Sequence, residues 1–555
     1  MNSPKNRHRF TPLLMSLSMI VGVFLGLFYS AHFSRSNLSI INGGTNKLGN
    51  LLEVINQCYV DEVNMDSLVE NSIPLILKEL DPHSSYIAAS DVQDAEDQLS
   101  SSFSGIGVSF TMQKDTVNVM QVIKGGPAEK VGLLPGDRII TANKDTLIGM
   151  PNTEVMKHLK GEKGSKVRLG IKRRKSPDLI YYDVIRGDIP IKSVDVAYML
   201  DKNTGYVHVT SFSEKTYEEF IVALVELGVK GMENLVIDLR GNHGGYMQVA
   251  IQMAEEFLKR NKLIVYTEGV HSKREDYYSR GRGSFQTLPL VVLVDDASAS
   301  ASEIFAGAMQ DNDRAVIIGR RTFGKGLVQQ PLSFKDRSQV RLTIARYYTP
   351  SGRCIQKPYV GGHDEDYELE LLARYERGEY FSEDSIKNTG PAYHTTLGRL
   401  VYGGGGIRPD IFVPEDTTSI TSYYREAVVE GYVREFCFDY TDDNREELLK
   451  QGSVEELEEY LKKQRLLEKF AAHADKNGLQ RRNLMLQQSR KLFERAIIGN
   501  IIYNLHSTEE YQEYLNEDDK TVKKALQVIE AGLTFPKAGE RFVLPSEVDQ
   551  NAKKK

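Results

Sequence analysis

Apolar runs alternate with amphipathic stretches through the middle of the chain and predict alternating strands and helices. Three runs rich in β-branched residues have the length of buried strands: 235–240, 290–294 and 315–318. Residues 216–227 carry apolar positions at helical spacing, and a helix rich in small residues is expected from Ile304 onward. This alternation predicts an α/β core over residues 186–410.

The hydrophobic pattern changes on both sides of this core. Residues 46–97 show helical spacing and predict an N-terminal helical region, whereas residues 101–174 alternate short strands with glycine turns. Residues 415–545 combine dense charge with helical spacing and predict a helical C-terminal domain. Residues 357–395 are expected to be loop-like, and their acidic cluster at 364–370 predicts a solvated face rather than a metal site.

A basic segment followed by an apolar segment opens the chain. Lys5, Arg7 and Arg9 lie in a basic tail at 1–12, and the stretch at 13–30 is apolar apart from a few residues. This order is typical of a signal peptide or a signal anchor. Because the end of the stretch is a poor small-x-small cleavage site, the sequence favours an uncleaved anchor with its basic end in the cytoplasm.

Length and composition narrow the possible classes of protein. A chain of 555 residues implies more than one domain, and a net charge of −6 argues against a nucleic-acid-binding protein. Cys58, Cys354 and Cys437 are too few and too scattered for a disulfide framework or a CxxC metal site, although one disulfide is left open. No HExxH motif occurs either, so neither a metal nor a cofactor is expected.

A serine and a lysine stand where nucleophilic chemistry is feasible. Ser300 follows the strand at 290–294 and precedes a helix, so its hydroxyl is expected beside the free N–H groups of a helix N-terminus. Lys325 lies between two glycines after an apolar stretch. A lysine can activate a serine only if burial keeps its amine neutral. By spacing alone, an N-cap serine and a solvated lysine explain the pattern at least as well.

The motifs around these two residues carry a family resemblance. The sequence SASASEI at 298–304, FGKG at 323–326, QQ at 329–330 and LDPHSSY at 80–86 resemble the C-terminal processing (tail-specific) serine peptidases. The resemblance covers about residues 46–410. It implies an α/β, multidomain protein with a crotonase-like (ClpP-like) peptidase core, an inserted PDZ domain and flanking helical regions.

The resemblance also assigns roles within the core. It implies Ser300 as the nucleophile, Lys325 as its base and Gln329 as a support for the lysine. Asp311 is sometimes counted in the charge relay of the family, with a structural role at a helix end as the alternative. The oxyanion hole is implied to use the N–H of Ala301 together with a glycine loop, as described next.

The glycine loop at 241–245 offers Gly244 and Gly245 as the second oxyanion donor. His243 in the same loop departs from the pattern expected of the family. A mechanism in which His243 activates Ser300 is less favoured than one in which Lys325 does. His83 in the LDPHSSY element is more simply explained by capping or core packing.

Residues 101–174 resemble a PDZ domain through GGPA at 125–128 and LLPGD at 133–137. The carboxylate-binding loop and strand are implied to be Gly105, Ile106, Gly107 and Val108, with the groove helix at 153–159. Backbone N–H groups at a glycine turn can hold a terminal carboxylate, and an exposed strand edge can pair with an extended peptide. A small structural β-domain is the plainer alternative.

Two other functions are weighed against the peptidase. Residues 319–326 nearly match the phosphate-binding loop GxxxxGK followed by Ser or Thr, but Gly326 stands where the hydroxyl is needed. The second alternative is a non-catalytic envelope scaffold whose PDZ domain binds exported tails. An inactive scaffold would be expected to have lost at least one catalytic residue, so the intact set of Ser300, Lys325 and Gln329 argues against this alternative.

The sequence therefore predicts a serine endopeptidase that cleaves proteins near their C-terminal tails through a Ser–Lys dyad. It is expected in the bacterial cell envelope, anchored in the inner membrane with its catalytic region in the periplasm. An adaptor protein and a homo-oligomer are left open as partners, and no nucleic acid is expected.

Overall fold

The computed structural model describes residues 15–25, 46–97, 100–174, 176–387 and 390–537. The predicted basic tail at 1–12 lies outside the described residues, and of the predicted anchor only residues 15–25 are described, as a helix. Within the described ranges, no helix combines the length and the apolar character needed to cross a membrane.

The chain divides into two compact units, residues 1–76 and 77–555. The first unit contains helix α2 (Lys47–Cys58) and most of α3 (Met65–Lys78), as the helical spacing predicted. The second begins with β1 (Ser85–Ile87) and α4 (Val92–Asp97). It holds the PDZ-like region, the α/β core and the C-terminal helices.

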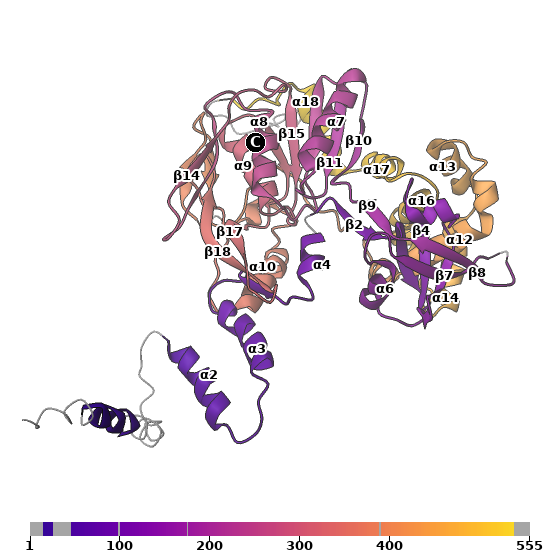
Figure 1. The fold of residues 1–555 in the computed structure, drawn as a ribbon. Coiled ribbons are helices and arrows are strands. Elements are labelled where there is room, and N and C mark those ends of the chain that lie inside the picture. Colours follow the sequence, from indigo (N-terminus) through magenta and orange to yellow (C-terminus); the bar gives the residue numbers. More distant parts are fainter. Residues whose placement is uncertain (1–14, 26–45, 98–99, 175, 388–389, 538–555) are drawn as a thin grey trace, which may run out of the picture. The chain divides into compact units, whose positions relative to one another are not determined.

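A six-stranded sheet forms the centre of the α/β core (Figure 1). Its strands, in spatial order, are β10 (Val194–Met199), β11 (Thr204–Val209), β12 (Asn234–Asp238), β15 (Leu290–Val294), β16 (Val316–Gly319) and β21 (Ile411–Phe412). All neighbouring pairs are parallel except β10 with β11. The three buried runs predicted from the sequence are the central strands, because a parallel sheet buries both of its faces.

Helices cover both faces of this sheet. Helices α7 (Thr216–Val229), α8 (Met247–Glu255) and α9 (Ala301–Asp311) pack on the face that carries Ile237 and Val292. The opposite face carries Val236 and Val291 and packs against α18 (Lys520–Glu530). The last helix of the predicted C-terminal domain therefore packs into the α/β core.

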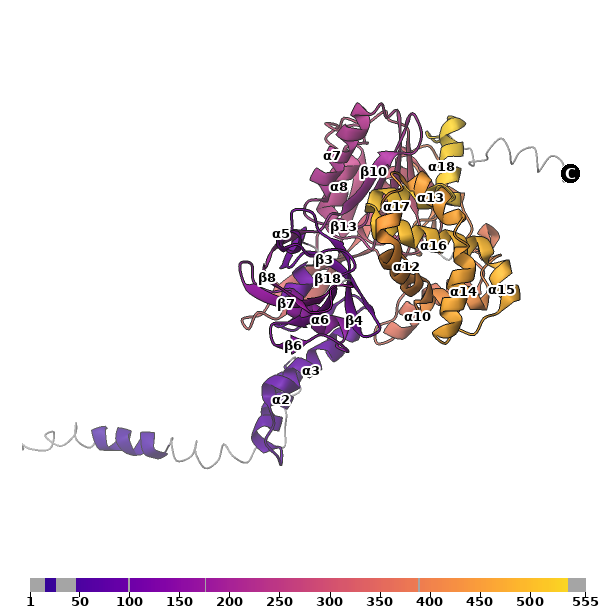
Figure 2. The same ribbon diagram turned by 90° about the vertical axis from the view of Figure 1, so that its right-hand side faces the viewer.

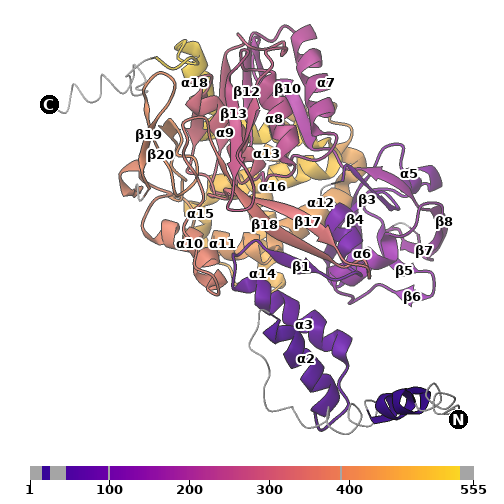
Figure 3. The same ribbon diagram turned by 60° about the vertical axis from the view of Figure 1, so that its left-hand side comes forward.

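A second, antiparallel sheet lies beside the first and can be followed in Figure 3. Its strands are β1, β13 (Leu263–Glu268), β14 (Glu275–Tyr278), β17 (Leu327–Ser333) and β18 (Gln339–Tyr348). Strand β18 pairs with β1, β13 and β17. This pairing places the end of the LDPHSSY element and the segment that follows Lys325 on opposite edges of β18.

The PDZ-like region is a separate sheet with its own hydrophobic core. The sheet comprises β3 (Val108–Gln113), β4 (Thr116–Val122), β5 (Arg138–Ala142), β6 (Asp145–Thr146), β7 (Lys166–Lys172) and β8 (Ile180–Ile185), with helices α5 (Pro127–Val131) and α6 (Asn152–Leu159). Strand β8 follows the predicted boundary at 174 and still pairs with β7. Strands β2 (Ser102–Gly105) and β9 (Gly187–Pro190) pair at the point where the chain enters and leaves this region.

Seven helices after residue 421 pack around a shared apolar core (Figure 2). They are α11 (Ser422–Val429), α12 (Tyr432–Leu448), α13 (Val454–Lys462), α14 (Leu466–Lys476), α15 (Asn483–Gln488), α16 (Arg490–Leu505) and α17 (Thr508–Asn516). These seven helices are called the helical domain below.

The prediction that residues 357–395 are loop-like is wrong. They contain the helix α10 (Asp364–Glu376), followed by η1 (Glu383–Ser385) and β19 (Ala392–His394), which pairs with β20 (Leu400–Tyr402). Only Tyr367 and Arg374 of α10 are buried. The helix thus docks through polar contacts and shows no apolar stripe that a sequence pattern could reveal.

Candidate active site

Two loops meet where the parallel strands β12 and β15 end. Because these strands are neighbours, the glycine loop after β12 and the serine turn after β15 emerge at the same edge of the sheet. The Ser298 hydroxyl donates to Leu239 O at 2.8 Å, and the Ser302 hydroxyl donates to Asn242 O at 2.9 Å. The N–H of Ala299 also donates to Asn242 O, at 3.0 Å. The outer serines of SASAS thus lock the two loops together.

The middle serine, Ser300, stands apart from its neighbours. It precedes the first turn of α9 with φ 54° and ψ −113°, a backbone conformation that is costly for a residue with a side chain. Its side chain is half-buried, whereas Ser298 and Ser302 are fully buried. A strained strand-to-helix turn that presents one serine is the geometry of an activated nucleophile.

The glycine loop approaches Ser300 closely. A Cβ atom added to Gly244 would lie 2.7 Å from the Cβ of Ser300, so only glycine fits there. The N–H of Gly244 donates to Asn242 Oδ1 at 2.8 Å and is therefore occupied. Within the described part of the chain, the N–H groups of Gly245 and Ala301 have no acceptor. Of the two predicted glycines, Gly245 is the one with a free donor.

Lys325 lies in the loop between β16 and β17, and a buried glutamate ties this loop to the serine turn. Glu303, fully buried in the first turn of α9, accepts the N–H of Ser300 at 2.9 Å and the N–H of Lys325 at 2.9 Å. It also accepts the N–H of Gly324 at 2.8 Å and the hydroxyl of Thr322 at 2.5 Å. One carboxylate therefore fixes the backbone of both predicted dyad residues.

A tyrosine makes a second connection. The Tyr347 hydroxyl lies 3.1 Å from the carbonyl oxygen of Ser300 and 2.5 Å from that of Lys325. Gly326 donates its N–H to Gln356 Oε1 at 2.7 Å, which holds the far side of the loop. The structure thus brings the backbone of Ser300 and the backbone of Lys325 together, and the pairing of their side chains stays a prediction.

The surroundings of Lys325 favour its neutral amine. Burial lowers its pKa, and the positive charge of Arg341 lowers it further, whereas Asp81 and Glu303 act in the opposite direction. Among the described residues Lys325 forms no ion pair. Burial also raises the pKa of Glu303 to about 7. A buried lysine without a counter-ion is suited to accept a proton near neutral pH.

Gln329, the predicted support of the lysine, lies on β17 opposite β18. Its amide nitrogen donates to the Thr343 hydroxyl at 3.2 Å, and that hydroxyl donates to Asp81 at 3.0 Å. The Asp81 carboxylate also accepts the hydroxyl of Ser84 at 2.6 Å. Gln329 therefore belongs to a polar network with the LDPHSSY element, and direct support of Lys325 stays a prediction.

Asp311 lies at the opposite end of α9 from Ser300, about 15 Å along the helix axis. Its carboxylate accepts from Arg353 at 2.7 Å and from the hydroxyl of Ser351 at 2.6 Å. The side chains of Asp311 and Arg353 are fully buried. These contacts match the structural alternative for Asp311, and a role in the charge relay stays a prediction.

Two histidines lie near the site in different environments. His83 shares a 2.8 Å hydrogen bond with the Tyr367 hydroxyl, and burial together with the charge of Lys325 lowers its pKa to about 4. His243 is exposed on the glycine loop. The contact of His83 agrees with the packing role favoured by the sequence.

The predicted tail-binding residues lie at the entrance to the PDZ-like sheet. Gly105 ends β2, Val108 begins β3, and Gly107 between them has φ +80°. Strand β3 pairs only with β4 among the described strands, which leaves its other edge open for an added peptide strand. Helix α6 agrees with the predicted groove helix.

The structure does not support a phosphate-binding loop at residues 319–326. The loop that contains Gly319 to Gly326 connects two strands, β16 and β17, and therefore lacks the helix that a phosphate-binding loop requires. The three cysteines are free thiols, which resolves the disulfide left open by the sequence. The expectation of no metal and no cofactor stays a prediction.

Sequence reasoning missed several residues of the site. Four residues contact Ser300 or Lys325 or influence the pKa of Lys325, and none of them was assigned a role from the sequence: Glu303, Tyr347, Arg341 and Asp81. A signal for Glu303 was present, because a glutamate three residues after a serine at a helix start is typical of a capping box. The others are recognised only through the pairing of β18.

Three family profiles match different parts of the chain. Residues 203–369 match peptidase family S41 and contain both Ser300 and Lys325. Residues 104–181 match a PDZ domain, and residues 423–507 in the helical domain match a family of unknown function (DUF8443).

Curated relatives agree with these matches. The carboxy-terminal processing protease CtpA of Bacillus subtilis is 34% identical over 348 residues, which cover 62% of this chain and 74% of the relative. The carboxy-terminal-processing protease of Bartonella bacilliformis is 34% identical over 315 residues, covering 56% of this chain and 72% of that protein. Among solved structures, a photosystem II D1 C-terminal processing protease is 28% identical over 55% of this chain and 88% of its own, with a TM-score of 0.33.

Proposed function

Because the chain belongs to peptidase family S41 and is a C-terminal processing serine protease, we propose that Ser300 and Lys325 form its catalytic dyad. The observation that carries this proposal is the shared Glu303 carboxylate, which binds the backbone of both residues. The lowered pKa of Lys325 supplies the base that Ser300 needs. His243, by contrast, is exposed on the glycine loop.

The proposed reaction begins with proton transfer from the Ser300 hydroxyl to the neutral amine of Lys325. Ser300 Oγ then bonds to the carbonyl carbon of the substrate, and the N–H groups of Gly245 and Ala301 donate to the resulting oxyanion. The Lys325 ammonium returns its proton to the leaving amine as the peptide bond breaks. Water, deprotonated by Lys325, then hydrolyses the ester at Ser300.

The PDZ domain gives the substrate class. A PDZ domain beside a C-terminal processing protease supports binding of protein tails through the open edge of β3 and the groove helix α6. We propose that Gly105, Ile106, Gly107 and Val108 bind the terminal carboxylate. The family match supports an active enzyme rather than the non-catalytic scaffold.

The proposed location is the bacterial cell envelope, with the N-terminal segment anchored in the inner membrane and the catalytic region in the periplasm. The order of basic and apolar residues within 1–30 supports it. Fractionation of cells that express the full chain, with and without residues 1–30, tests this proposal. Recovery of both forms in the cytosol would overturn it. An adaptor and a homo-oligomer stay predictions.

The dyad is tested with the full-length chain and an unfolded protein that ends in an apolar, free C-terminus. Cleavage is followed by intact mass for the wild type and for Ser300→Ala, Lys325→Ala and Lys325→Arg. All three variants are expected to lose at least about 10³-fold in rate. The arginine variant is decisive, because it keeps a long cation but cannot be deprotonated. Activity retained by Lys325→Arg would show that the lysine acts as a charge and not as the base.

A further inference from the structure

One face of α12 in the helical domain is acidic. Glu435, Asp439, Asp442 and Asp443 follow at positions i, i+4, i+7 and i+8, which lie on one side of an α-helix. They are called the acidic face of α12 below. The opposite side carries buried residues of that domain's own core, among them Val433, Cys437 and Leu448. The acidic face therefore lies outside the apolar core of its domain, although Glu435 also lies 3.7 Å from His473 of α14.

Basic residues of the PDZ domain contact this face. Lys114, in the turn between β3 and β4, places Nζ 2.6 Å from Glu435 Oε1 and 3.7 Å from Asp439 Oδ2. Arg138 and Arg174 each lie 3.6 Å from Asp442 Oδ2, and Arg174 also pairs with Asp443. Lys114, Arg138 and Arg174 are called the basic face of the PDZ domain. The charges of the two faces are complementary at every pair.

Uncharged contacts accompany the ion pairs. Gln113 donates its amide N–H to Glu435 O at 3.4 Å, and Gln121 donates to Tyr503 O on α16 at 3.3 Å. The Arg138 guanidinium lies 5.7 Å from the centre of the Phe438 ring, which is 3% exposed. A Cβ atom added to Gly136 would lie 2.7 Å from Asp442 Oδ1. The two domains thus approach closely at Gly136.

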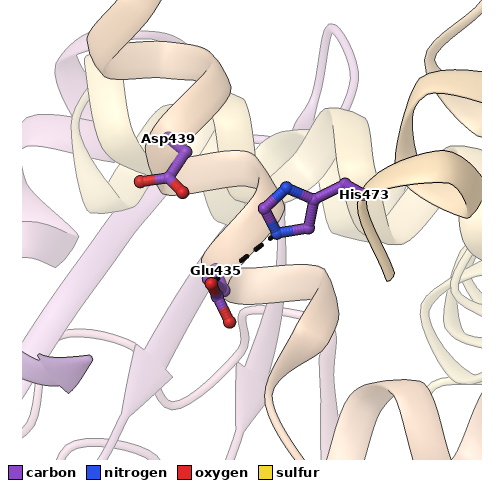
Figure 4. Close-up of side chains that lie close together, drawn as sticks. All are labelled: Glu435, Asp439 and His473. Carbon is purple, nitrogen blue, oxygen red and sulfur yellow. Dashed lines mark ion pairs between the residues drawn. The ribbon is translucent and has the colours of Figure 1, made fainter. Parts of the chain in front are cut away.

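Figure 4 shows two carboxylates of the acidic face of α12 beside a histidine. Glu435 and Asp439 from α12 meet His473 from α14, and their potential ligand atoms all lie within 4.8 Å of one another. Such a set could hold a divalent metal ion. However, the Lys114 ammonium already lies against Glu435 and supplies a positive charge. The pKa of Lys114 is raised chiefly by its hydrogen bond with Glu435. We therefore interpret the cluster as an ion-pair network.

We propose that the helical domain is a docking platform for the PDZ domain of the same chain, with the acidic face of α12 binding the basic face of the PDZ domain. This inference gives a role to the segment that matches a family of unknown function. The ion pairs involve the β3–β4 turn, β5 and the segment after β7, and Gln113 and Gln121 add hydrogen bonds from β3 and β4. The tail-binding groove is formed instead by the open edge of β3 and α6. A docked PDZ domain can therefore still receive a protein tail.

The composition of the interface makes the docking reversible. Its contacts are mostly charged, and the Lys114 side chain is 60% exposed. A cavity of about 470 Å³ opens between the two domains, lined by Pro135, Arg174 and Asp442 among others. Polar interfaces between domains resemble transient protein–protein contacts, and exposed ion pairs weaken as salt is added. Docking is therefore expected to weaken at high ionic strength.

Amide hydrogen exchange on the full-length chain tests the proposal without using peptidase activity. The first variant, Lys114→Glu with Arg174→Glu, reverses two charges of the basic face. The second adds Glu435→Lys and Asp443→Arg, which swaps the charges across the interface. Lys166→Glu is the matched control, because Lys166 is also 60% exposed but pairs with Asp183 inside the PDZ domain.

The double reversal is expected to raise exchange in the β3–β4 hairpin and in α12 by roughly threefold to tenfold. The charge swap is expected to restore protection, and the control is expected to match the wild type. Strands β12 and β15 report whether each variant is folded. Wild-type protein in high salt should show the same rise at the same two segments. Unchanged exchange in both the reversal variant and high salt would overturn the proposal, as would a swap that restores nothing.

Discussion

Replacing Glu303 with glutamine should damage catalysis more than it damages the fold. The Glu303 carboxylate uses one oxygen for Thr322 and Gly324 and the other for Ser300 and Lys325. A glutamine has one acceptor oxygen and one NH₂ group. In either orientation it therefore turns an NH₂ group toward two buried donors.

The size of the effect follows from these four contacts. Each buried donor left without an acceptor costs about 1–3 kcal/mol, so two of them cost about 2–6 kcal/mol. The turn that carries Ser300 or the loop that carries Lys325 is expected to move and so restore hydrogen bonds, because the Glu303 carboxylate binds both segments. A displacement of about 1 Å between nucleophile and base costs roughly 10²-fold in rate. We expect Glu303→Gln to lower kcat by at least that factor.

The assay separates this geometric effect from simple loss of stability. Cleavage rates are measured with the unfolded tail-bearing substrate, and urea denaturation gives the free energy of unfolding of each variant. Asp313→Asn is the matched control, since Asp313 is also a buried carboxylate and accepts from Leu397 and Arg399 beyond the far end of α9. The control should lose stability and keep its kcat. Equal kcat in Glu303→Gln and the wild type would refute the role assigned to Glu303.

Three further predictions concern the same site. Arg341→Gln removes a positive charge that lowers the pKa of Lys325, so the pKa of Lys325 should rise. Because the neutral amine is the active form, the fall in activity on acidification should begin at a higher pH than in the wild type. An unshifted acidic limb of the kcat/KM profile would contradict this. Gly244→Ala should abolish cleavage while circular dichroism stays native, because the new Cβ would lie 2.7 Å from the Cβ of Ser300; full activity would show that the loop is not where the structure puts it. Asp311→Asn should lower the free energy of unfolding, measured by urea denaturation, by about 3–5 kcal/mol, because it breaks the buried pair with Arg353. A fall in kcat without loss of stability would instead place Asp311 in the charge relay.

The sequence alone determined the features that local patterns encode. The central strands were readable because a buried parallel strand needs a continuous apolar run, as at 290–294. The motifs around Ser300 and Lys325 identified the family, since they are short and specific. The PDZ region was readable from its glycine turns.

Only the tertiary structure decided which groups meet around Ser300 and Lys325. Glu303 binds backbone N–H groups up to 22 residues away, and no periodicity in the sequence reports such a contact. The preference for Gly245 over Gly244 depends on the Asn242 side chain, which occupies one of two adjacent N–H groups. Helix α10 escaped prediction because it docks through a tyrosine and an arginine and not through an apolar stripe.

The relation between the domains was also beyond the sequence. In the sequence, the acidic residues of α12 are equally consistent with a helix face exposed to solvent, and the segment around Lys114 indicates only an ordinary hairpin turn. The residues in contact lie far apart in the chain, by 322 residues in the case of Gln113 and Glu435. Charge complementarity is a property of two surfaces in space, and a local pattern specifies only one of them at a time.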